Sequence, residues 1–122
     1  MNPKKFPMIL LALVALIFAV SCSTGTKAKL GNSTREDKNG WIFVHLEGTP
    51  DEIGFQHGYH LAPEIDDALQ IFAFYLQKAT TKDWTFYREA AERMFWPKLE
   101  PEYQAEIEGI VAGLKARLPA KN

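Results

Sequence analysis

Residues 40–65 read GWIFVHLEGTPDEIGFQHGYHLAPEI, and they predict one strand, one tight turn and the start of a long helix. Over residues 41–46, aromatic and β-branched side chains alternate with a period of two, which is the pattern of a strand. Neither face of that strand is polar, so we expect it to be covered on both sides. Gly48 then lets the chain turn.

The start of the helix is marked by three residues. Thr49 suits an N-cap, because its hydroxyl can accept a hydrogen bond from a free amide of the first turn. Pro50 fits the first helical position, where no amide hydrogen is needed. Glu52 falls three residues after Thr49 and completes a capping box. We therefore predict a helix that begins at Pro50.

An apolar ladder with steps of three and four residues continues this helix along one face. Gly54 and Gly58 lie four residues apart beside it, and each glycine costs about 1 kcal/mol against alanine in a helix. We expect that another backbone, in the sheet, approaches closely there. Pro63 removes a backbone hydrogen bond and predicts a kink or split over residues 59–62. The ladder consists of Ile53, His57, Leu61, Ile65, Leu69, Phe72 and Leu76.

Two further amphipathic helices are predicted downstream. After a polar connection over residues 78–83, Thr81 or Asp83 caps a second helix, which Pro97 ends. Pro101 opens a third helix, which Pro119 stops, and this helix again carries two glycines four residues apart, Gly109 and Gly113.

The N-terminal segment has the features of a secretory leader. Lys4 and Lys5 precede an unbroken apolar run over residues 8–20, which is short for a membrane span but typical of a signal peptide. Ser21-Cys22 follows and resembles a bacterial lipoprotein processing box. We predict a signal peptide over residues 1–21, a lipidated Cys22 and anchoring to a membrane of the bacterial cell envelope. The alternative is an ordinary secretory signal followed by an incidental cysteine.

Composition limits the function of the rest. Residues 22–40 are mostly small and polar, which predicts a flexible tether between the lipidated cysteine and a domain over residues 41–122. Without Lys4 and Lys5, 12 of the 14 basic residues remain against 15 acidic ones, a net charge of −3 that does not favour nucleic acid. Cys22 is the only cysteine, which excludes an internal disulfide and a cysteine metal cluster.

The predicted fold class is α+β, with one strand followed by three helices. A single strand cannot form a sheet, and its backbone groups need partners. An exposed strand with two apolar faces also risks aggregation. The sequence therefore predicts that this domain is part of a larger, otherwise incomplete structure.

Three motifs carry a resemblance to a known family: GTPDEIGFQHG at residues 48–58, FWPK at 95–98 with Tyr103, and EIxGIxxG at 106–113. Together they resemble the penicillin acyltransferase-like family, which also includes phospholipase B-like proteins, over roughly residues 41–118. The resemblance implies an N-terminal nucleophile hydrolase, with two sheets between two layers of helices. In such proteins a precursor cuts itself before a cysteine, which then attacks a carbonyl with its own α-amino group as base.

The resemblance implies that this chain supplies the segment before that cut and not the nucleophile. No catalytic residue is predicted in the chain, because the sequence after Gly113 ends in PAKN and no serine follows Ser33 to pair with a histidine. The expected function is the inactive N-terminal part of a membrane-anchored amide hydrolase or acyltransferase, with the downstream segment as partner and no cofactor. Three origins of the chain fit this expectation: a truncated gene, a fragment of a longer protein and a subunit of a split enzyme. The alternative is a small lipid-anchored helical binding or structural module without activity.

We expect structural roles for the motif residues. For His57 we favour a hydrogen-bonded position between helix and sheet over a role in substrate binding or processing. His57, His60 and Glu64 share a helical face, but a metal site is not predicted because no fourth ligand is in view. The motif set is Thr49, Pro50, Glu52, Gly54, His57, Gly58, Trp96, Pro97, Gly109 and Gly113.

Overall fold

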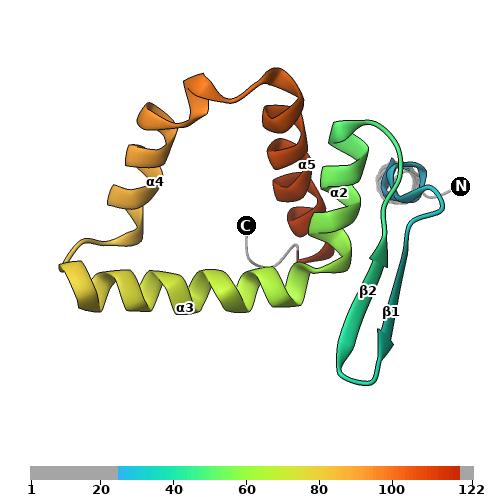
Figure 1. Cartoon of the computed structure of the whole chain (residues 1–122), viewed down its shortest axis with the longest axis horizontal. Helices are drawn as coiled ribbons and strands as arrows, with labels where there is room; N and C mark the ends of the chain where they lie inside the picture. Colours follow the sequence, from blue (N-terminus) through green and yellow to red (C-terminus); the bar gives the residue numbers. More distant parts are fainter. Residues whose placement is uncertain (1–24, 119–122) are drawn as a thin grey trace, which may run out of the picture. The chain divides into compact units, whose positions relative to one another are not determined.

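The computed structural model describes residues 25–118, which divide into two compact units after Gly31 (Figure 1). In the first unit, residues 25–30 are helical. The second unit begins at Asn32 and contains all the elements described below. The predicted signal peptide, Cys22 and Pro119 lie outside the described residues.

The second unit opens with a β-hairpin. Strands β1 (Thr34–Lys38) and β2 (Trp41–His45) pair antiparallel, with Thr34 opposite His45 and Lys38 opposite Trp41. Asn39 and Gly40 form the turn with positive φ angles of 53° and 82°. Asn-Gly is the preferred sequence for such a two-residue connection.

The prediction of a single unpaired strand is therefore wrong, and the stretch expected to be a tether contains β1. The sequence of β1 is TREDK, which has no apolar alternation, so composition alone indicated a linker. The strand forms because the Asn-Gly turn folds it onto β2. The boundary between the two units also precedes β1, at Gly31.

The predicted long helix is split in two. Helix α2 (Pro50–His60) ends at Leu61, and α3 (Ala62–Thr80) begins directly after it, with Pro63 in its first turn. The predicted split near Pro63 is confirmed. Thr49 caps α2 in a complete capping box with Glu52, which confirms the predicted start of the helix.

The remaining helices follow the predicted order. Helix α4 (Trp84–Met94) is capped by Asp83, whose carboxylate accepts a hydrogen bond of 2.9 Å from the amide of Phe86. Thr81 instead ends α3 in the left-handed conformation. A short 3₁₀ helix, η1 (Trp96–Lys98), leads to α5 (Pro101–Arg117). The described chain is a mixed α+β structure, as predicted at that level.

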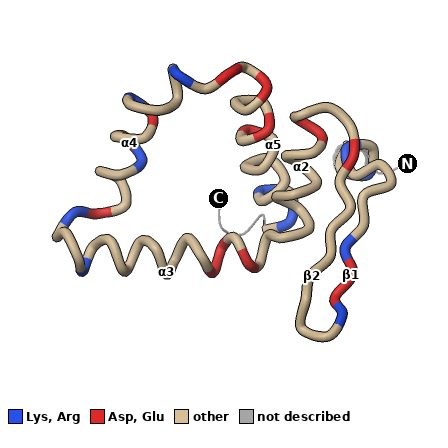
Figure 2. The backbone as a smooth tube through the Cα atoms, viewed as in Figure 1, with Lys and Arg blue, Asp and Glu red and all other residues tan. Residues whose placement is uncertain are grey.

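Few apolar side chains are buried in the described part of the chain. Phe55 and Ala62 are the buried apolar residues there. Many large apolar side chains face solvent, including Trp41 at 74% and Phe74 at 64% exposure. Figure 2 shows that β2 and the middle of α3 carry no charged residue. Within residues 25–118, no helix combines the length and the apolar character needed to cross a bilayer.

Candidate functional site

The first and last sequence motifs meet in the contact between α2 and α5, which lie side by side (Figure 1). The helices run in the same direction, since Gly54 faces Glu106 and Gly58 faces Ile110. A Cβ atom at Gly54 or Gly58 would lie 2.0 Å from the carbonyl oxygen of Glu106 or Ile110, respectively. The two backbones therefore touch where side chains would normally separate them.

The glycines of α5 complete the same contact. A Cβ atom at Gly109 would lie 2.4 Å from the carbonyl oxygen of Asp51, and one at Gly113 would lie 2.1 Å from that of Phe55. The predicted close approach of another backbone is thus confirmed, but the predicted partner is wrong. The partner is α5 and not the sheet, because α5 carries a matching pair of glycines one helical turn apart.

Buried Gln56 ties the end of β2 to α2. Its side chain is 2% exposed, accepts a hydrogen bond of 2.9 Å from the amide of Glu47 and donates one of 2.9 Å to the carbonyl oxygen of the same residue. The side-chain amide of Gln56 thereby makes the two hydrogen bonds to the Glu47 backbone that a neighbouring strand would otherwise make. No role for Gln56 is predicted from the sequence, since spacing does not show which backbone groups its side chain meets.

The capping box depends on a glycine. Gly48 has a φ of 123°, and a Cβ atom there would lie 2.5 Å from the Glu52 carboxylate. That carboxylate accepts hydrogen bonds of 2.9 Å from both the amide and the hydroxyl of Thr49. Thr49, Pro50 and Glu52 therefore have structural roles at the start of α2.

The other predicted motif residues do not converge on one site. His57 is half-buried on α2. Trp96 and Pro97 lie in η1, and the carbonyl oxygen of Trp96 accepts a hydrogen bond of 2.8 Å from the side chain of Gln104 at the start of α5. This bond fixes the connection between α4 and α5, which gives the FWPK motif a structural role.

A polar cluster joins the hairpin to the α2–α3 junction. The guanidinium of Arg35 on β1 donates two hydrogen bonds to Glu64, at 2.8 and 2.9 Å, and one of 2.6 Å to the carbonyl oxygen of His60. It also contacts Asp37 at 3.0 and 3.1 Å. Hydrogen bonds to Glu64 and then to Asp37 raise the pKa of Arg35, and the bond from Arg35 lowers the pKa of Glu64.

The cluster also contains a serine–histidine pair. The hydroxyl of Ser33 lies 2.9 Å from Nε2 of His60. The prediction that no serine lies beside a histidine is wrong, because Ser33 was expected in a tether and instead precedes β1. Spacing could not reveal this pair, since 27 residues separate its members.

The surroundings of His60 make it a poor general base. Burial lowers the pKa of His60, and the positive charges of Arg35 and then Arg117 lower it further. A serine nucleophile needs a histidine that can take a proton and is then stabilised as imidazolium by a carboxylate. Cations next to His60 have the opposite effect. The bond between Ser33 and His60 therefore has a structural role, because it attaches the segment before β1 to the junction of α2 and α3.

Acidification should weaken this cluster. Because the pKa of folded His60 lies below its ordinary value of 6.5, the folded state binds fewer protons than the unfolded state. The contribution of neutral His60 to the stability of the folded state is present above that ordinary value, and it is lost as pH falls through the lower folded pKa. We expect a lower melting temperature near pH 5 than near pH 7.5, and a smaller difference in His60→Gln. An equal difference in both proteins, measured by circular dichroism, would contradict this role.

The described residues show no metal centre. Across residues 25–118, no group of three or more histidine, cysteine, aspartate or glutamate side chains is arranged to hold an ion. His60 and Glu64, two members of the set considered from the sequence, have Ser33 and Arg35 as partners.

Comparisons with known proteins do not identify the chain. No protein-family model, no characterised protein and no solved structure matches it.

Proposed function

We propose that residues 41–118 form the segment that precedes the nucleophile in a cysteine N-terminal nucleophile hydrolase, an amide hydrolase or an acyltransferase. In this proposal the chain is inactive alone and contributes a strand and helices to a sandwich of two sheets between two helical layers. The catalytic cysteine and most of the sheet come from a downstream segment.

The observation that carries the proposal is the contact between α2 and α5. The motifs that resemble the family, residues 48–58 and 106–113, are separated by almost 50 residues yet interlock through four glycines. Two motifs that together build one contact between helices have a scaffold role. A scaffold is also the role that the resemblance implies for this segment.

The exposed apolar surface also supports the proposal. Trp41 and Phe43 share one face of β2 with exposures of 74% and 56%, and Ile42 and Val44 on the other face are 38% and 36% exposed. Edge strands that face water usually carry charges. Those charges are on β1, at residues 35–38, whereas β2 has none. This asymmetry fits a sheet that continues beyond β2.

Co-expression tests the proposal. The DNA downstream of this coding sequence should encode a segment with a cysteine preceded by a self-cleavage site, in the same or another reading frame. We expect that segment and this chain together to hydrolyse acyl amides, and neither to do so alone. A chain that is monomeric and stably folded, without a cysteine-bearing partner, would favour the alternative of a small lipid-anchored binding or structural module.

The proposal places the chain at the bacterial cell envelope through Cys22. Lipoprotein maturation would supply more than one acyl chain, which stable anchoring requires. We expect Cys22→Ser to move the protein from the membrane fraction to the soluble fraction, and mass spectrometry of the wild type to show a lipidated cysteine at the mature N-terminus. An unmodified Cys22, or cleavage at another position, would contradict the anchor.

A further inference from the structure

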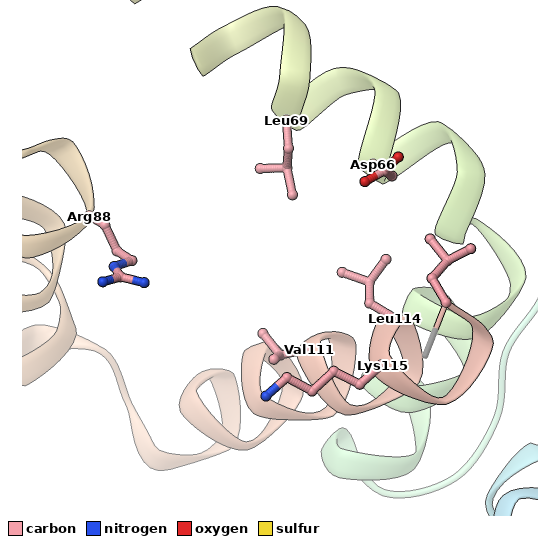
Figure 3. A pocket seen from close by; sticks show the side chains of 7 residues that line it. Asp66, Leu69, Arg88, Val111, Leu114 and Lys115 are labelled. Carbon is pink, nitrogen blue, oxygen red and sulfur yellow. The ribbon is translucent and has the colours of Figure 1, made fainter. Parts of the chain in front are cut away.

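A pocket between α3, α4 and α5 combines charged side chains with an apolar wall (Figure 3). Its volume is about 500 Å³, within the range of small-molecule sites. Four aliphatic residues form the wall: Leu69, Val111, Leu114 and Leu118.

Two cations line the same pocket. Arg88 enters from α4, and Lys115 extends from α5 toward the side where Arg88 lies (Figure 3). Within residues 25–118, neither side chain has a hydrogen bond or an ion pair. The one acidic lining residue, Asp66, accepts a hydrogen bond of 2.8 Å from Gln70. The pocket therefore offers two positive charges and one negative charge, a net charge of +1, beside aliphatic surface.

This combination argues against a protein segment as the occupant. Lysine and aspartate, which line this pocket as Lys115 and Asp66, are depleted in the centre of protein interfaces. The uncharged surfaces of β2 and of α3 over residues 70–77 fit that description, whereas the pocket does not. A ligand with an acidic head and an aliphatic tail would match both parts of the lining.

We propose that this pocket binds a single-chain amphipathic anion, an alkyl chain that ends in a carboxylate. Arg88 and Lys115 would hold the carboxylate through charge-assisted hydrogen bonds. The alkyl chain would lie against Leu69, Val111 and Leu114. A volume of about 500 Å³ suits one alkyl chain better than the two chains of a phospholipid. This inference does not depend on the proposed enzyme assembly.

Photolabelling tests the site in the full chain, held in washed membranes. A fatty acid with a diazirine in its alkyl chain is crosslinked, and the labelled peptides are mapped by mass spectrometry. We expect labels on the α3 and α5 residues of the pocket. Excess fatty acid should compete with the probe at least about tenfold better than its methyl ester, because the ester lacks the charge that the cations bind.

Reversing the charge of Arg88 distinguishes labelling by a probe bound in the pocket from labelling by non-specific contact with lipid. Arg88→Glu should lower labelling of the pocket about tenfold or more, whereas Arg93→Glu, on the same helix but outside the lining, should not. Equal competition by the methyl ester, or unchanged labelling in Arg88→Glu, would overturn the proposal. It would also fail if the labels spread over β2 and residues 71–75, or if only a diazirine phosphatidylglycerol labelled the pocket.

Discussion

Gly58→Ala should destabilise the protein by about 3 kcal/mol or more, although alanine is normally the better helix residue by about 1 kcal/mol. The added methyl group would lie 2.0 Å from the carbonyl oxygen of Ile110. That oxygen belongs to the backbone of α5 and cannot move aside as a flexible side chain would. The clash is relieved only if α2 and α5 move apart, and this movement removes the main contact between elements distant in sequence.

The size of the effect follows from how little else is buried. A small domain has a total stability of about 5–15 kcal/mol. Here the buried apolar residues of the described part are Phe55 and Ala62, and a Cβ atom at Gly113 would meet the backbone of Phe55. We therefore expect Gly58→Ala to lose a large fraction of the total stability.

Two further variants calibrate this prediction. Gly113→Ala should act like Gly58→Ala, since its methyl group would lie 2.1 Å from the carbonyl oxygen of Phe55. Ala112→Gly, at the neighbouring exposed position, should cost only the ordinary 1 kcal/mol or so. Urea unfolding of the full chain in mild detergent, followed by circular dichroism, gives all three values. If Gly58→Ala were as stable as the wild type, the helix contact would be misassigned.

The sequence predicted the helix termini well because their signals are local. Thr49, Glu52 and Asp83 cap helices by hydrogen bonds to amides three residues away, so the interacting groups can be read from spacing. Pro63 split the predicted helix for an equally local reason.

Contacts between distant segments were predicted less well. Gly54 and Gly58 indicated a close backbone, but a glycine pair does not state which partner it meets. β1 was missed because its side chains are polar, and only the Asn39-Gly40 turn could have indicated the hairpin. Arg35 and Ser33 were overlooked with it, since their partners on α2 and α3 lie at least 25 residues away.

The isolated chain should have no amide hydrolase or acyltransferase activity. Nucleophilic catalysis needs an activated thiol, hydroxyl or amine beside a base. The only thiol is that of Cys22, and its α-amino group could not act as base if lipoprotein maturation acylates it. Among the residues described by the structure, Ser33 beside His60 is the arrangement that most resembles a nucleophile with its base.

The charges around that pair should prevent catalysis. Proton transfer from Ser33 would create an imidazolium on His60, next to the guanidinium groups of Arg35 and Arg117, which already lower the pKa of His60. Glu64, the nearby carboxylate, is engaged by Arg35 through two hydrogen bonds. The imidazolium would therefore be destabilised where a catalytic triad stabilises it.

Assays with a panel of acyl amides and esters should show no turnover above background for the full chain, and none for Cys22→Ser. Ser33→Ala should leave this result unchanged but lower the melting temperature, because it removes the bond to His60. Turnover that survives Cys22→Ser and disappears in Ser33→Ala would show that the pair is a catalytic site after all. Activity that appears only when the downstream segment is added would instead support a nucleophile outside this chain, since the surroundings of His60 would be the same in both experiments.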